Sequence, residues 1–149
     1  MTQPGLARPD DEGSVLVLML GLVVVLVLLV GVVVDVSALV LSRRSLASTA
    51  DGAAVSAAQG LDYGRFYADG PAAGVPLSGA VVAERVATYA EGATQDQPGL
   101  QLQSRVDDGY VAVVTATRTV RLPFGRGLGI ADVVVTAEAR ARAPLLVGP

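Results

Sequence analysis

One uninterrupted apolar stretch dominates the pattern of the chain: residues 14–34, SVLVLMLGLVVVLVLLVGVVV. It contains no charged residue and no proline. As a helix that rises about 1.5 Å per residue, it spans about 31 Å, close to the thickness of about 30 Å of a bilayer's hydrocarbon core. The rest of the chain is too short to surround such a helix with protein. We therefore predict a single transmembrane helix at 14–34, in contact with membrane lipid.

The helical pattern continues beyond Asp35. Small apolar residues recur at spacings of three, four and seven as far as Ala57, while Ser, Thr and Arg occupy the other faces. Gly60 is a natural C-terminal stop. We predict one continuous helix to Gln59, and the segment 35–60 lies outside the membrane. Its stripe of alanines suits close packing against a sheet or another helix.

Two acidic residues on this helix are candidate assembly contacts. A carboxylate deep in the membrane would indicate a functional site, but Asp35 falls at the headgroup boundary by length. Asp35 is therefore either a plain interfacial residue or a contact with a charged group of a partner. Asp51 lies among alanines, where it is either solvent-exposed or a second assembly contact.

Residues 61–149 predict a small external domain. The segment 61–79 is rich in Gly, Pro and aromatic residues, which is typical of a connecting loop. Ser78 is placed to cap a helix over 80–91, and 92–99 is a further loop. Three strands follow, with alternating apolar residues: Leu100, Leu102 and Val106; then Tyr110, Ala112, Val114, Ala116, Val120 and Leu122, with Arg118 as an exception; then Val133, Val135, Ala137, Ala139 and Ala141.

The predicted fold class is α+β. The apolar strand faces are rich in alanine, so a helix can lie closely on the sheet, and the alanine stripe of the long helix is the obvious mate. We expect a long N-terminal transmembrane helix that continues into an Ala-rich helix packed on a small antiparallel sheet, with the second helix alongside. This arrangement resembles that of pilin-type subunits.

The register of the first hairpin can be predicted from its apolar faces. A three-residue loop, Asp107-Asp108-Gly109, pairs Val106 with Tyr110, and Leu102 then meets Val114. A two-residue turn would place Leu102 on the Thr-rich face, because a slip of one residue flips a strand. We predict the three-residue loop, with Gly109 in the left-handed bulge position.

Two further segments have alternative interpretations. Tyr63, Phe66 and Tyr67 form either a contact site or, as we expect, a lid over the small core. The glycine-rich segment 123–129 lacks the Lys-Ser/Thr ending of a phosphate-binding loop, and we predict a flexible connection between two strands.

Composition removes most catalytic chemistry. The chain has neither Cys nor His, and all 11 of its basic residues are Arg, so the usual nucleophile, general base and metal ligands are missing. A membrane-tethered enzyme is the second hypothesis, and paired carboxylates do occur, as Asp107-Asp108, but a turn explains them. A net charge of −3 without a basic cluster argues against nucleic acid. We predict a non-catalytic protein with no cofactor, metal or small-molecule substrate.

Residues 1–13 are polar and rich in helix breakers, and form a short leader or a cytoplasmic tail. Glu12-Gly13-Ser14 is similar to a type IV prepilin processing site, in which cleavage follows the Gly. Leu18 stands where such proteins carry Glu. The alternative is a permanent anchor, with the acidic residues before Gly13 favoured by the helix dipole. Charge leaves the orientation open, because Arg8 lies on one side and Arg43 and Arg44 lie on the other.

The combination of DEGSVLVL, the long apolar run, Gly31-x-x-x-Asp35, an Arg pair and STADGAA at 48–54 resembles the TadE/TadG-like proteins of the tight-adherence (Flp) pilus system. Asp35 and Asp51 match the family's two acidic positions, and Gly52 replaces its usual Ala. Residues 127–142 also resemble the tail of these proteins.

This resemblance implies a minor pilin-like or assembly component that contacts other Tad subunits. It also implies a single-pass protein of the cytoplasmic membrane with its C-terminal domain outside. The alternative is a membrane-tethered extracytoplasmic binding module whose tyrosine-rich loop meets a ligand.

Overall fold

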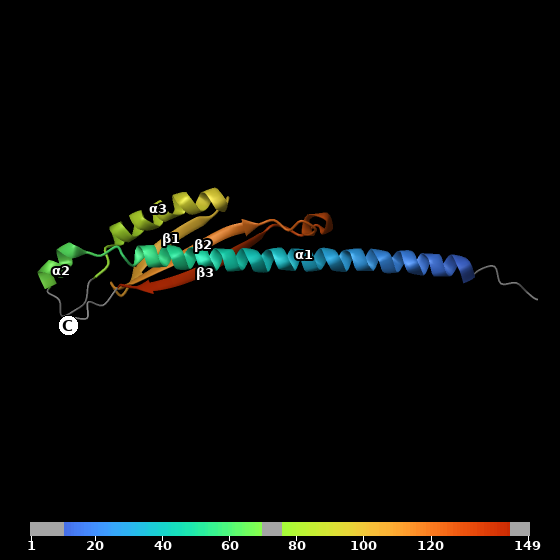
Figure 1. Cartoon of the computed structure of the whole chain (residues 1–149), viewed down its shortest axis with the longest axis horizontal. Helices are drawn as coiled ribbons and strands as arrows, with labels where there is room; N and C mark the ends of the chain where they lie inside the picture. The colour runs from blue at the N-terminus through green and yellow to red at the C-terminus, as the bar shows by residue number, and fades with distance from the viewer. Residues whose placement is uncertain (1–10, 70–75, 144–149) are drawn as a thin grey trace, which may run out of the picture.

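The protein is described by a computed structural model covering residues 11–69 and 76–143. The elements are α1 (Asp11–Ala57), α2 (Tyr63–Asp69), α3 (Gly79–Asp96), β1 (Gln101–Asp107), β2 (Val111–Val120), the 3-10 helix η2 (Gly125–Leu128) and β3 (Val133–Arg142). Figure 1 shows a long rod, α1, with a small head gathered around its C-terminal part.

The rod is one unbroken α-helix of 47 residues, about 70 Å long at about 1.5 Å per residue. No proline interrupts it, which allows the apolar run and the alanine-rich part to join without a kink. The helix ends at Ala57, and the backbone N–H of Gly60 then donates to the carbonyl of Ala57 at 2.9 Å. The continuous helix predicted from the sequence is thus present.

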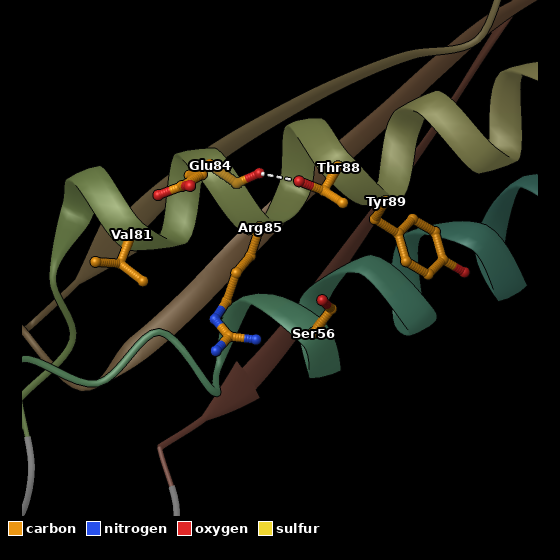
Figure 2. Close-up of a pocket in the computed structure, with 6 residues that line it drawn as sticks. All are labelled: Ser56, Val81, Glu84, Arg85, Thr88 and Tyr89. Atoms are coloured by element: carbon orange, nitrogen blue, oxygen red, sulfur yellow. Dashed lines mark hydrogen bonds between the residues drawn. The ribbon is translucent and has the colours of Figure 1, made fainter.

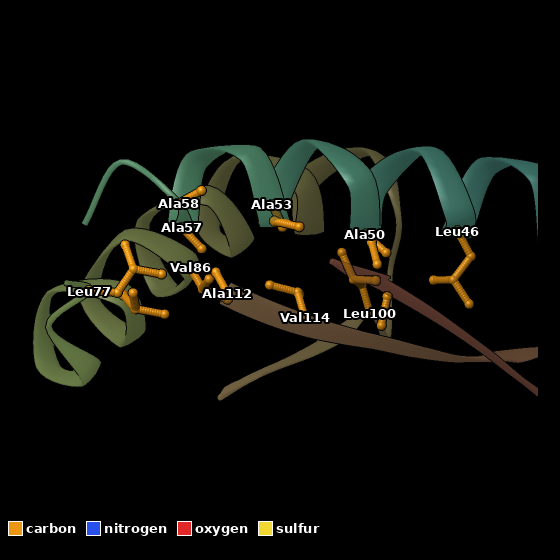
Figure 3. Close-up of a cluster of buried hydrophobic side chains, with 14 of the residues drawn as sticks. Leu46, Ala50, Ala53, Ala57, Ala58, Leu77, Val86, Leu100, Ala112 and Val114 are labelled. Atoms are coloured by element: carbon orange, nitrogen blue, oxygen red, sulfur yellow. The ribbon is translucent and has the colours of Figure 1, made fainter. Parts of the chain in front are cut away.

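The head is an antiparallel sheet of three strands in the order β1-β2-β3, with α1 and α3 side by side on one face. The predicted α+β fold is confirmed. The stripe of small residues on α1 is fully buried against the sheet and meets a second set of small residues on β2, as Figure 3 shows. Alanine on both surfaces lets the helix lie close to the strands, so the core is thin and needs few large side chains. The two sets are Ala50, Ala53, Ala54 and Ala57 on α1, and Ala112, Val114 and Ala116 on β2.

The predicted register of the first hairpin is wrong by two residues. Val106 pairs with Ala112 and not with Tyr110, and the three-residue loop is formed by residues 108–110. Asp108 and Gly109 both have left-handed backbones (φ 51° and 76°), and the N–H of Tyr110 donates to the carbonyl of Asp107 at 3.2 Å. Asp tolerates this conformation better than most residues, so the turn forms one residue later than predicted. A shift of two keeps each strand's apolar face toward the helices.

The second helix is longer than predicted. It begins after Ser78, as expected, but it continues beyond residue 91 to Asp96. Ala93 packs against the core, and this contact stabilises the extra turn of the helix although it contains Gly92. Gln97, the residue before Pro98, leaves the helical conformation, as expected because proline disfavours a helical residue before it.

The segment 61–79, predicted to be a loop, contains the short helix α2, and a single β-bridge joins Leu61 to Leu77. Tyr63 and Tyr67 on α2 are 62% and 81% exposed. The prediction that the aromatic group forms a lid over the core is therefore wrong for these two residues. The side chain of Phe66 lies outside the described part of the structure.

Candidate functional site

The N-terminal part of α1 presents a continuous apolar surface. From Val15 to Val30 every Leu, Val and Met side chain is between 49% and 73% exposed. Among the described residues, α1 is the one helix whose length and composition would allow it to cross a membrane. It therefore has the properties of a single-pass anchor. Gly13 and Ser14, the candidate processing site, lie exposed in its first turns.

The head first meets the rod at Gly31, which is buried. The ring of Phe124, from the connection between β2 and β3, lies directly against it. A Cβ atom added at Gly31 would come within 3.3 Å of Phe124 Cγ. Glycine at this position allows the close approach of the ring, and a larger side chain would push the connection away.

Asp35 holds the same connection through a hydrogen bond. The backbone N–H of Phe124 donates to Asp35 Oδ1 at 3.1 Å. Gly31 and Asp35 are four residues apart and so lie on one face of the helix. Gly31 contacts the ring of Phe124, and Asp35 accepts a hydrogen bond from the backbone of Phe124. The sequence singled out Asp35 but missed Phe124. The spacing Gly31-x-x-x-Asp35 was the available signal. It places a residue without a side chain and a carboxylate hydrogen-bond acceptor next to each other on one face of the helix.

The connection between β2 and β3 is compact. The N–H of Gly127 donates to the carbonyl of Phe124 at 3.1 Å, and the N–H of Ile130 donates to the carbonyl of Gly125 at 2.8 Å. Gly129 has the positive φ of 75° that closes the turn. The segment predicted as a flexible connection thus contains a 3-10 helix with its own hydrogen bonds, seated on α1.

Asp51 lies in a different environment from Asp35. It is exposed, and it shares its face of α1 with Val55, which is 58% exposed. Within the described part of the chain, Asp51 forms no hydrogen bond or ion pair. The two acidic residues are about 24 Å apart along the helix at about 1.5 Å per residue. The structure therefore does not bring them into one site, and Asp51 is the more exposed of the two.

Gly52 lies beneath Tyr89 of α3. A Cβ atom at Gly52 would collide with the Tyr89 hydroxyl and lie 3.0 Å from its Cζ. The ring thus occupies the space that an alanine at this position would need. Beside it, a shallow groove separates α1 from α3, and in Figure 2 Arg85 extends across it toward α1. The lining residues of the groove are Ser56, Val81, Glu84, Arg85, Thr88 and Tyr89. They include one acidic and one basic side chain, and they do not pair a nucleophile with a general base.

Arg118, the exception on the apolar face of β2, is explained by a polar junction at the edge of the core. Its guanidinium donates to Gln97 Oε1 at 3.5 Å and to Ser42 Oγ at 3.4 Å. Gln97 Nε2 in turn donates to the hydroxyl of buried Thr49 at 2.7 Å. This chain of contacts joins α1, β2 and the C-terminal end of α3 where the alanine packing stops.

The outer face of the sheet carries a network of exposed charges. Arg105 and Arg140 both contact Glu138, at 3.4 and 3.1 Å, and Arg140 also lies 3.7 Å from Asp107. Hydrogen bonds from Arg140, and then from Arg105, lower the pKa of the Glu138 carboxyl below its usual value. Val113 is fully buried between the two arginines in the register, because the aliphatic parts of long side chains cover apolar surface.

The structure and its surfaces define a class: a protein with a long apolar helix whose far end packs into a small α+β head of two helices on a three-stranded antiparallel sheet. Among the described residues, no group of three His, Cys, Asp or Glu side chains is arranged to hold a metal ion.

Residues 13–60 match the family model described as "Putative Flp pilus-assembly TadE/G-like". The match begins at Gly13 and ends at Gly60, so it covers nearly all of α1, and it confirms the TadE/TadG-like assignment made from the sequence. It covers about a third of the chain, and the head lies outside it. Neither the search of curated proteins nor the search of solved structures returned a match.

Proposed function

We propose that this chain is a non-catalytic, minor pilin-like or assembly subunit of a Tad/Flp pilus, anchored in the cytoplasmic membrane with its head on the extracytoplasmic side. Residues 14–34 span the bilayer, residues 35–60 continue the helix outside the membrane into the head, and residues 61–149 form the external domain. The observation that carries the proposal is the exposed apolar surface of α1, which coincides with the segment matching a pilus-assembly family. Exposed Leu and Val over several turns are unfavourable in water and favourable in lipid.

The anchor and its orientation can be tested together, because the chain has no natural cysteine. We expect Ser48→Cys, on the exposed face of the rod, to react with a membrane-impermeant maleimide in intact cells. Ser14→Cys, at the other end of the apolar run and retained whether or not residues 1–13 are removed, should react only after permeabilisation. Release of the protein by alkaline carbonate would contradict the anchor, and the opposite labelling pattern would contradict the orientation.

Asp51 is the better candidate for contact with other Tad subunits than Asp35. Asp51 is exposed, whereas Asp35 is half-buried and already accepts a hydrogen bond from the backbone N–H of Phe124. We expect Asp51→Asn to reduce pilus number and co-purification with other Tad subunits without changing the amount of the protein in the membrane. Glu91→Gln, which removes an exposed acid from α3, is the matched control and should leave both unchanged. Normal pili with Asp51→Asn would exclude this contact.

Processing after Gly13 is a separate part of the proposal. Mass spectrometry of the protein extracted from membranes distinguishes the two outcomes. A chain beginning at Ser14 indicates prepilin-type processing, whereas a chain retaining residues 1–13 indicates a permanent anchor at the base of the pilus.

A second candidate function is an extracytoplasmic binding module, favoured by the exposure of Tyr63 and Tyr67 on α2. Exposed tyrosines on a short element are frequent contact residues in binding sites. Alanine at Tyr63, Phe66 and Tyr67 separates the two functions. Loss of adhesion with intact pili supports the module, and loss of pili supports an assembly role for this loop.

A further inference from the structure

The connection between β2 and β3 carries apolar side chains to the same level as the apolar surface of α1. Phe124 and Ile130 are each 49% exposed, although both are large and apolar. Phe124 rests on Gly31, which lies three residues inside the predicted membrane segment, about 4.5 Å from its end at about 1.5 Å per residue. Figure 1 shows this connection reaching along α1 beyond the rest of the head, toward the bare part of the rod.

An apolar hollow lies between this connection and the rod. Its lining contains only apolar residues and glycine, and it extends one turn deeper along α1 than the contact at Gly31. The lining residues are Val27, Leu28, Gly31, Val32, Phe124 and Gly127. The hollow is thus continuous with the exposed apolar surface of the helix.

We propose that the β2–β3 connection is a second membrane contact, which inserts Phe124 and Ile130 into the interfacial layer of the outer leaflet and receives a lipid acyl chain in the hollow beside Leu28. The inference rests on the proposed function, in which α1 spans the bilayer. Whatever solvates Val27 and Leu28 also solvates the adjacent ring of Phe124, because the three residues line one hollow. Apolar side chains inserted near the headgroup boundary are the usual means by which a protein segment binds the membrane surface.

The charged pair at the base of the connection is placed consistently with this level. At its base, Arg121 and Asp132 form an exposed ion pair at 3.9 Å. Charged groups in the headgroup layer with apolar groups beneath them are typical of interfacial segments. Two membrane contacts, α1 and the connection, would then fix the tilt of the head relative to the membrane. A single transmembrane helix would leave this tilt variable.

The absence of tryptophan from the chain allows a direct test. Single variants Phe124→Trp and Ile130→Trp are reconstituted, as the full chain, in phosphatidylcholine–phosphatidylglycerol vesicles with bromine at shallow or deep acyl positions. Leu26→Trp, in the middle of the apolar run, reports the anchor. Tyr63→Trp, on the exposed helix α2, reports a position in water.

We expect Phe124→Trp and Ile130→Trp to emit at shorter wavelength than Tyr63→Trp and to lose at least half as much fluorescence as Leu26→Trp. Shallow bromines should quench them more than deep bromines, the opposite of Leu26→Trp. Adding Gly31→Leu, which displaces the ring from the rod, should reduce the quenching of Ile130→Trp.

Three results would overturn the inference. If Leu26→Trp is quenched while both loop variants behave like Tyr63→Trp, α1 is an anchor and the connection does not contact lipid. If the loop variants emit at short wavelength but are not quenched, protein and not lipid covers the hollow. If Leu26→Trp itself is not quenched, the proposed anchor fails, and the inference fails with it.

Discussion

Replacing Gly52 by alanine is a sensitive test of how α3 packs on the rod, because two effects of similar size oppose each other. In a helix interior, Gly→Ala is favourable by about 0.5–1 kcal/mol, since glycine loses more backbone entropy on folding. At Gly52, however, the new methyl group would collide with the Tyr89 hydroxyl and approach its Cζ to 3.0 Å. Tyr89 is half-buried and its hydroxyl is the far end of the side chain, so the ring can turn aside at a cost of about 1 kcal/mol, the lower end of the usual range for overpacking. We therefore expect Gly52→Ala to leave the free energy of unfolding nearly unchanged.

The size of the effect should depend on Tyr89. In a Tyr89→Ala background the space above Gly52 is open, and we expect Gly52→Ala to stabilise the head by about 0.5–1 kcal/mol. Gly92→Ala is the matched control within the intact protein. Gly92 is helical and has nothing within 4 Å of an added Cβ atom, so this variant should stabilise by a similar amount.

Pulse proteolysis of the full chain in detergent micelles, over a series of urea concentrations, measures these changes. The head becomes cleavable when it unfolds, and the urea midpoint reports its stability. If Gly52→Ala stabilises the wild-type protein as much as Gly92→Ala does, the ring of Tyr89 does not occupy the space above Gly52, and the packing argument is refuted.

Three further predictions use the same measurement. Leu46→Ala, at the one large side chain of α1 that is fully buried, should cost about 2–5 kcal/mol because it leaves a cavity; a loss below 1 kcal/mol would contradict the burial. Thr49→Val should cost about 1 kcal/mol by removing the acceptor of Gln97 Nε2, and an unchanged midpoint would mean that water replaces it fully. Glu138 binds a proton less readily in the folded state, since Arg140 lowers its pKa. The stabilisation that ionised Glu138 provides is therefore present above pH 4.5 and lost as the pH falls through the lowered pKa. Below pH 4.5 the urea midpoint of Glu138→Gln should therefore decline less than that of the wild type. Equal declines would exclude a contribution of Glu138 to stability.

The sequence determined the features that depend on periodicity. The apolar run, the absence of proline and the alanine spacing are local properties of a helix, and they sufficed to predict one continuous rod with an alanine face. Strand alternation likewise predicted which residues face the helices. The register of the first hairpin did not follow, because a shift of two residues preserves the alternation and is decided by the backbone of Asp108.

The contacts that define the candidate site were decided only by tertiary structure. Phe124 and Asp35 are separated by 89 positions, and nothing in the local pattern of either segment names the other. The same holds for Tyr89 and Gly52, where the sequence shows the glycine but not the ring that lies against it. A side chain's partner across the fold depends on how two surfaces dock, and docking is set by the whole core, whereas a helix or strand is set by residues a few positions apart.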